Sequence, residues 1–438
     1  MGTSKAQHQT PDIRVILGVL VIGCLMLAVG YWFFFKSSKT KAGDWLHRFA
    51  LFTALATLGL IAIGGLVTSN GVGMAVPDWP TSYGYNMFAL PFSIWFTGGV
   101  FHEHTHRQWA SCVGIFVVIL TRWLGGEKSR WPLLFVGGIE FAVGLLMFKL
   151  NDNLRGAGGF LSGIGGVVIL AGIAWFKNAP AARPLPAMGW WAFGLVQLQG
   201  LLGGLRVILD AHVVAGMKLG MVLGIFHACL AQGFFVLLCA IALLTSKWWR
   251  NGNIQQPTSN IEHPMVSRWP RNFVVITTAL IFLQLTIGAT MRHQHAGLAI
   301  KDFPLACGKL WPDTSAQAIE RYNSERMEVT DANPITAFQI DLQMVHRAMA
   351  LVIFCGVAIA AWQIRRFKKT VVRRLGFVWM GLIFMQIGLG AWTIWSDKAA
   401  DIATLHVLVG ALSLVTGALL CIIFSGGITE TNRAKAFA

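Results

Sequence analysis

The sequence predicts an all-α polytopic membrane protein made of two tandem, pseudo-symmetric four-helix bundles, and its composition is the first reason. Of 438 residues, 55% are hydrophobic and only 12% are charged, whereas a soluble domain carries about 25% charged residues. The mean hydropathy is +0.61. These values exclude a soluble enzyme and a disordered chain. The other two reasons are the lengths of the apolar runs and an internal repeat.

The apolar runs are long enough to cross a membrane. A span takes about 20 mostly apolar residues, and by that measure the chain has roughly eleven candidate spans. They lie near 14–35, 46–67, 99–123, 131–149, 156–176, 187–208, 216–244, 271–290, 338–363, 374–394 and 401–425. The first run is longer than the core of a signal peptide and lacks its cleavage pattern, so we expect a retained span.

Basic residues cluster in every second loop, which predicts that these loops face the cytoplasm. The odd number of spans then places the N-terminus outside and the C-terminus inside, in a bacterial-type cell (inner) membrane. This topology accounts for the net charge of +16, so no nucleic-acid partner is expected. The basic residues are Lys36, Lys39, Lys41, Lys128, Arg130, Lys177, Arg183, Lys247, Arg250, Arg268, Arg271, Arg365, Arg366, Lys368, Lys369, Arg373 and Arg374.

Four motifs occur twice in the same order, which indicates a duplicated unit. An Asp-aromatic-Pro loop comes first, followed by a His-Arg pair, a Gln-x3-Gly pair and, one span later, a single His. The first set is Asp78-Trp79-Pro80, His106-Arg107, Gln199-x3-Gly203 and His227. The second set is Asp302-Phe303-Pro304, His346-Arg347, Gln386-x3-Gly390 and His406.

The repeat predicts the division of the chain into domains. Two spans of the first unit, at 131–149 and 156–176, have no counterpart in the second unit. We interpret these two spans as an inserted helical hairpin. The predicted parts are 1–45 (an additional span with a basic loop), 46–244 (the first four-helix unit, with the hairpin at 131–176), 245–270 (a cytoplasmic linker), 271–425 (the second unit) and 426–438 (a cytoplasmic tail).

The four repeated histidines favour two haem sites. A buried histidine in a membrane helix needs a partner, and for a single one a hydrogen bond to a neighbouring helix is the ordinary explanation. Here His106 and His227 lie at one depth in the first unit, as His346 and His406 do in the second. Two imidazoles on facing helices hold a haem iron from both sides.

Zinc suits these positions less well, because no cysteine or carboxylate accompanies His227 or His406. Six of the seven cysteines lie in apolar runs and only Cys307 lies in a polar stretch, so no disulfide framework is predicted. Arg107 and Arg347 are candidates to bind haem propionates, and the alternative for both is anchoring at the membrane interface.

The two units differ at one position next to the histidines. Glu103 precedes His106 by three residues, whereas Gln343 occupies that place before His346. Only the first unit then has an ionisable group able to accept a proton, so we expect the reaction there. The alternative for Glu103 is a salt bridge to Arg107 one helical turn away. His104 is expected to be only interfacial.

The chain resembles the heme A synthases, membrane proteins of cytochrome oxidase assembly. The resemblance covers nearly all of both units. The resembling stretches are Gly64-Gly65-Leu66-Val67-Thr68-Ser69, Asp78-Trp79-Pro80, Glu103-His104-Thr105-His106-Arg107, Gln199 to Val207 with Arg206, His227, Asp302-Phe303-Pro304, His346-Arg347, Gln386-x3-Gly390 and His406.

The resemblance implies that His346 and His406 hold a permanent haem b, while His106 and His227 flank the iron of the substrate, heme O. Glu103 is implied as the acid needed to oxidise a ring methyl of heme O to a formyl group, and Arg206 is a further haem-contact candidate. Implied partners are a heme O synthase, cytochrome oxidase assembly factors and the lipid bilayer; a homo-oligomer is left open. Many members carry a cysteine where this chain has Val76.

Two other functions remain open at this point. A bis-histidine cytochrome b that transfers electrons, for example from quinol, accounts for the histidines but gives Glu103 no purpose. A transporter accounts for the repeat and predicts a colourless protein.

Overall fold

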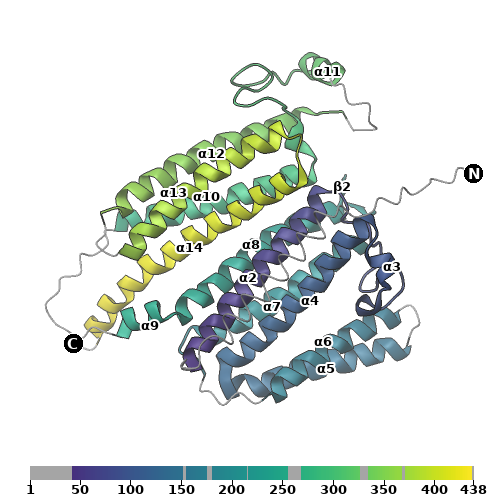
Figure 1. Cartoon of the computed structure of the whole chain (residues 1–438), viewed down its shortest axis with the longest axis vertical. Helices are drawn as coiled ribbons and strands as arrows, with labels where there is room; N and C mark the ends of the chain where they lie inside the picture. Colours follow the sequence, from purple (N-terminus) through teal and green to yellow (C-terminus); the bar gives the residue numbers. More distant parts are fainter. Residues whose placement is uncertain are drawn as a thin grey trace, which may run out of the picture. The chain divides into compact units, whose positions relative to one another are not determined.

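The computed structural model describes residues 42–150, 154–174, 180–214, 216–254, 268–325, 334–366 and 370–436, and most of them are helical (Figure 1). The predicted span at 14–35 lies outside these residues. The chain divides into two compact units, Met1–Gln256 and Pro257–Ala438.

Four long helices form a ring in the first unit. They are α2 (Ala42–Ser69), α4 (Gly98–Gly125), α7 (Leu185–Ile208) and α8 (Leu219–Thr245). Both α2 and α7 pack against α4 and α8, so α4 and α8 stand at opposite corners. Their apolar length explains the arrangement, because backbone groups in lipid must be satisfied within helices.

The inserted hairpin consists of α5 (Arg130–Leu150) and α6 (Arg155–Ile173), which pack tightly against each other. Glycines permit this approach: a Cβ on Gly137 would lie 2.8 Å from the carbonyl oxygen of Gly165. Small residues in register are typical of close helix pairs in membranes. The glycines at this contact are Gly137, Gly144, Gly158 and Gly165.

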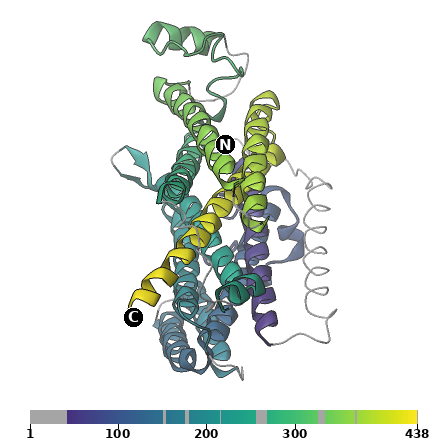
Figure 2. The same ribbon diagram turned by 90° about the vertical axis from the view of Figure 1, so that its left-hand side faces the viewer.

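The second unit repeats the ring with α10 (Arg268–His293), α12 (Ala337–Ile364), α13 (Thr370–Trp395) and α14 (Ala400–Ala436). Both α10 and α13 pack against α12 and α14, so α12 and α14 stand at opposite corners as α4 and α8 do. Figure 2 shows the long helices of each unit running alongside one another.

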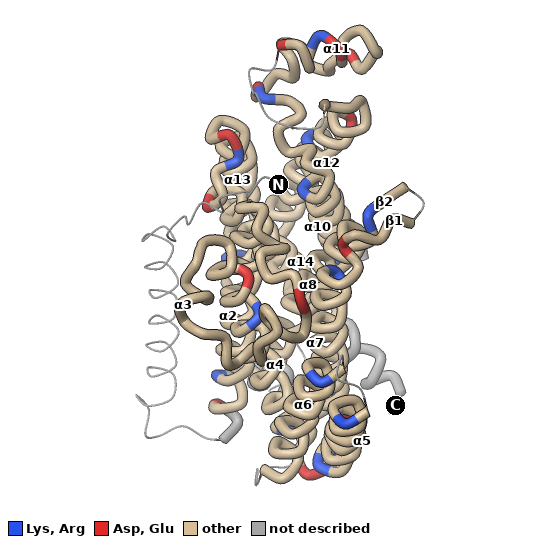
Figure 3. The backbone as a smooth tube through the Cα atoms, turned by 90° about the vertical axis from the view of Figure 1, so that its right-hand side faces the viewer, with Lys and Arg blue, Asp and Glu red and all other residues tan. Residues whose placement is uncertain are grey.

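Nine helical segments among the described residues are long and apolar enough to cross a membrane. One of them, Gly98–Leu150, contains two predicted spans, because α4 continues through the 3-10 helix η2 (Gly126–Ser129) into α5. Figure 3 shows the charges gathered mainly near helix ends. The predicted all-α polytopic membrane fold is therefore confirmed.

Short elements connect the long helices. They are η1 (Met87–Ala89), α3 (Phe92–Trp95), β1 (Val213–Val214), β2 (Met217–Lys218), α9 (Lys247–Ile254), η4 (Ala296–Leu298) and α11 (Ala316–Ser324). The strands β1 and β2 pair antiparallel between α7 and α8.

Candidate functional site

The Asp-aromatic-Pro loops of the two units have the same hydrogen bonds. The carboxylate of Asp78 accepts the backbone N–H groups of Tyr83 and Gly84 at 2.7 and 2.9 Å. Such turns suit aspartate because its short side chain reaches the backbone of the same loop. The second loop repeats both distances, from Cys307 and Gly308 to Asp302.

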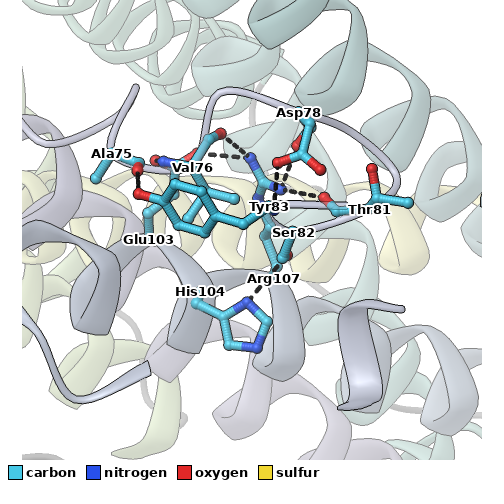
Figure 4. Close-up of polar contacts among 9 residues, drawn as sticks. All are labelled: Ala75, Val76, Asp78, Thr81, Ser82, Tyr83, Glu103, His104 and Arg107. Carbon is cyan, nitrogen blue, oxygen red and sulfur yellow. Dashed lines mark hydrogen bonds and ion pairs between the residues drawn. The ribbon is translucent and has the colours of Figure 1, made fainter. Parts of the chain in front are cut away.

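In the first unit, Glu103 and Arg107 of α4 hold this loop (Figure 4). The Glu103 side chain, in a residue only 4% exposed, accepts the Val76 N–H at 2.8 Å and forms a 2.8 Å ion pair with Arg107. Arg107 also donates to the carbonyl oxygens of Val76 (2.7 Å), Asp78 (2.7 Å) and Thr81 (3.1 Å). The salt bridge considered as the alternative role of Glu103 is therefore present.

In the second unit, Gln343 and Arg347 of α12 hold the loop in a related way. The Gln343 amide oxygen accepts the Ile300 N–H at 2.7 Å, and its nitrogen donates to the Ile300 carbonyl at 3.2 Å. Arg347 donates to the carbonyl oxygens of Asp302 and Leu305 at 2.8 and 2.9 Å. Gln343 alone thus binds both the N–H and the carbonyl of Ile300. In the first unit, Glu103 binds the N–H of Val76 and Arg107 binds its carbonyl.

These contacts occupy the side chains of Arg107 and Arg347, the two arginines predicted to bind haem propionates. The terminal nitrogens of Arg107 have four N–H groups, and four oxygens already accept from them. Arg107 therefore anchors the loop, and its propionate contact stays a prediction. Arg347 likewise directs both terminal nitrogens at loop carbonyls.

Arg206 of α7 is the third predicted haem-contact residue, and it lies within electrostatic range of His106 and His227. Its guanidinium rests on Gly73, where an added Cβ would lie 2.6 Å from Nη2. It also interacts electrostatically with Glu103, His106 and His227. The corresponding residue of the second unit, three positions after the repeated glycine, is Thr393. Arg206 is thus a feature of the first unit alone.

The histidines of the second unit face each other. His346 on α12 and His406 on α14 come from opposite corners of the ring, and their ring centroids are 6.4 Å apart with an interplanar angle of 55°. Gln386 of α13 places its amide nitrogen 3.3 Å from His406 Nε2. Gln284 of α10 donates to the His346 carbonyl at 2.9 Å.

The first unit places its histidines in the same way. His106 lies on α4 and His227 on α8, again at opposite corners of the ring. Gln199 of α7 donates to the His227 carbonyl at 3.1 Å. This hydrogen bond joins α7 to α8 beside the histidine.

Each of the four imidazoles lies against a glycine of the neighbouring helix, where an added Cβ would press on the ring. A Cβ on Gly64 would lie 2.8 Å from His106 Cε1. The other three pairs are Gly203 with His227 at 3.3 Å, Gly288 with His346 at 3.3 Å and Gly390 with His406 at 3.2 Å. Gly203 and Gly390 belong to the repeated Gln-x3-Gly motif. Gly64 is not part of such a motif, because no glutamine stands four residues before it.

The pair His346 and His406 fits a haem held between the two rings. Two rings on one metal ion, each with a nitrogen–metal bond of about 2 Å, have centroids about 6 Å apart, in agreement with His346 and His406. The Nδ1 atoms of all four histidines are buried without a hydrogen-bond partner. Buried polar atoms normally have such a partner, so each ring keeps an unused polar atom. Within the described residues no group of three or more His, Cys, Asp or Glu suits a metal ion.

His104 lies on α4 two residues before His106 and is fully buried within the protein. Its Nδ1 lies 3.2 Å from the hydroxyl of Ser82 and its Nε2 lies 3.1 Å from the amide nitrogen of Gln108. Two neighbouring polar groups therefore satisfy the ring, and His104 joins α4 to the loop.

The chain is similar in sequence to known proteins. A sequence model of the cytochrome oxidase assembly protein family matches residues 160–418, a stretch that contains His227, His346 and His406. The chain belongs to this family. Relatives of this family member carry the name heme A synthase, so the resemblance predicted from the motifs is confirmed.

Three relatives illustrate the similarity. A heme A synthase of Hyphomonas neptunium is 22% identical over 374 residues, covering 85% of this chain and 91% of the relative. That of Caulobacter sp. is 27% identical over 229 residues, or 51% of this chain and 58% of the relative. That of Shouchella clausii is 22% identical over 275 residues, covering 63% and 68%. The alignment with the Caulobacter protein thus spans little more than half of that relative.

Proposed function

We propose that this protein is a heme A synthase, which oxidises a ring methyl of heme O, through an alcohol, to the formyl group of heme A. The observation that carries the proposal is the facing pair His346 and His406 at 6.4 Å, together with the matching placement of His106 and His227. Its named relatives support the same activity.

The second unit is the proposed site of haem b. His346 and His406 would hold the iron axially, and the bound haem would supply electron transfer. The protein's own contribution is to fix the rings: Gly288 and Gly390 let them approach the neighbouring helices. For the Gln386 amide, which now lies 3.3 Å from His406 Nε2, we expect a small rotation on binding.

The first unit is the proposed site of the substrate heme O. His106 and His227 would flank its iron, and Arg206 is the cation best placed to attract its carboxylates. Glu103 is the proposed acid of the reaction, as the resemblance implies. Its two oxygens already accept hydrogen bonds from Val76 and Arg107, so its first task is to hold the loop beside His106.

We also propose the setting of this activity. The protein would lie in a bacterial-type cell (inner) membrane. The basic loops favour a cytoplasmic C-terminus, and both histidine pairs would lie toward the outer leaflet. A heme O synthase as donor and cytochrome oxidase assembly factors as acceptors are the proposed partners, because heme O and heme A are poorly soluble in water.

One observation favours the alternative, a bis-histidine cytochrome b without haem-modifying chemistry. The difference between Glu103 and Gln343 has a structural explanation, since both side chains clamp the same loop position. The presence of Arg206 in the first unit only, beside both histidines, still favours different tasks for the two units.

Haem analysis after co-expression with a heme O synthase distinguishes the two functions. We expect mass spectrometry of the extracted haems to find heme A with the native chain, and a reduced low-spin b-type spectrum that His346→Ala and His406→Ala largely abolish. A b-type spectrum with heme O left unchanged would support the cytochrome. Full haem content in both variants would refute the second-unit site.

A further inference from the structure

The outer loop of the first unit has an unusual composition. Residues 79–101 contain no Asp, Glu, Lys or Arg, although they connect two helix ends, where charges are common. Eight of these residues are aromatic: Trp79, Tyr83, Tyr85, Phe88, Phe92, Trp95, Phe96 and Phe101.

One face of this loop is fixed against the bundle. Leu90 packs with buried Val76 and Val100, and Trp95 packs against the same cluster. The Trp95 indole N–H also donates to the Thr105 hydroxyl of α4 at 3.1 Å. The backbone of η1 and α3 therefore has a defined position.

The other face presents three phenylalanine rings to the surroundings. Phe88 is 64% exposed, Phe92 71% and Phe96 43%. Phe92 stacks on Trp95 with ring centroids 5.9 Å apart, so the fixed face holds the exposed one in place. Phe135, within the membrane-spanning helix α5, is exposed to the same degree as Phe92, at 70%.

The corresponding loop of the second unit is different. Between its Asp-aromatic-Pro motif and α12 it carries charges of both signs, several of them on α11. Figure 3 shows this contrast, with uncoloured backbone around α3 and both colours at α11. The charged residues of the described part are Lys309, Asp313, Glu320, Arg321 and Glu325.

We propose that residues 87–96 lie in the interfacial layer of the lipid bilayer, with Phe88, Phe92 and Phe96 directed into the acyl-chain boundary. Phenylalanine is typical of the apolar face of segments that lie in this layer, and an exposed apolar patch of this kind is unfavourable in water. The loop runs directly from one membrane-spanning helix to the next, so it begins and ends at the surface of the bilayer. The α11 region, by its charge, belongs in water.

Depth measurement by spin labelling tests this placement. In a full-length chain with its seven native cysteines replaced, Phe92→Cys carries a nitroxide, and Gln317→Cys on exposed α11 is the matched control. Each variant is placed as one copy per lipid nanodisc. We expect oxygen to relax the label at 92 more than a water-soluble nickel chelate does, and the reverse order at 317.

Two results would overturn the proposal. Nickel accessibility at 92 equal to that at 317 would place the loop in water. Shielding of position 92 from both reagents would instead indicate that protein covers the ring. Phe88→Cys gives a second reading on the same face, and the elution profile in size-exclusion chromatography checks that each labelled chain is folded.

Discussion

Glu103 and Gln343 make the same contact in the two units, since each side chain accepts one loop N–H, from Val76 at 2.8 Å and from Ile300 at 2.7 Å. The amide of Gln343 also donates to the Ile300 carbonyl. A carboxylate has no N–H to donate, and Arg107 donates to the Val76 carbonyl instead. The carboxylate of the first unit therefore depends on its arginine partner.

Replacement Glu103→Gln tests whether the carboxylate is needed beyond the clamp. The amide keeps an acceptor for Val76 but removes the ion pair, so we expect a loss of unfolding free energy of about 1–3 kcal/mol. If the carboxylate takes part in proton transfer, heme A formation falls by about a hundredfold, measured by haem extraction. Unchanged turnover would assign Glu103 to loop support alone. Gln343→Glu is the reciprocal control.

The glycines beside the histidines are expected to control ring position. In Gly390→Ala the new Cβ would lie 3.2 Å from His406 Cε1, so the ring must move by a few tenths of an ångström. We expect altered g-values of the low-spin haem in electron paramagnetic resonance. Gly388→Ala on the same helix is the control, because nothing lies within 4 Å of its added Cβ. Equal spectra for both variants would contradict the prediction.

The loop aspartate is expected to make stability depend on pH. Burial opposes ionisation of Asp78, but hydrogen bonds from Gly84, Thr81 and Tyr83 outweigh it and hold the pKa of Asp78 below its ordinary value. A lowered folded-state pKa adds stability above the ordinary pKa of about 4, and this contribution disappears as pH falls through the folded value. Melting temperatures between pH 5 and 3 should therefore fall less in Asp78→Asn. An identical decline would reject this role.

The inserted hairpin is expected to depend on its glycine contact. In Gly165→Ala the Cβ would lie 2.6 Å from the Gly137 carbonyl oxygen, and overpacking of backbone against backbone costs about 1–3 kcal/mol. We expect a lower melting temperature with haem content retained, because the histidines lie on other helices. Gly166→Ala, which meets nothing within 4 Å, should behave like the native chain. The reverse order would place the helix contact on the other face.

The order of the site along the chain follows from the repeat alone. In the structure, Gln199 and Gln284 donate hydrogen bonds to the carbonyls of His227 and His346 on the neighbouring helices. By contrast, the sequence does not predict that His104 and Arg107 hold the loop. Both residues are buried, and the loop groups that they contact, Ser82 and the Asp78 carbonyl, lie more than twenty residues away in sequence.

The amino-acid sequence by itself determined the membrane class, the helices and the duplicated order of the motifs, because apolar length and repeated spacing are local properties of a chain. Only the tertiary structure decided which helices stand at opposite corners, which glycine faces each imidazole, and that Glu103 and Gln343 both clamp a loop. Those relations depend on how each helix is rotated about its axis and on hydrogen bonds between distant segments, which local periodicity does not specify.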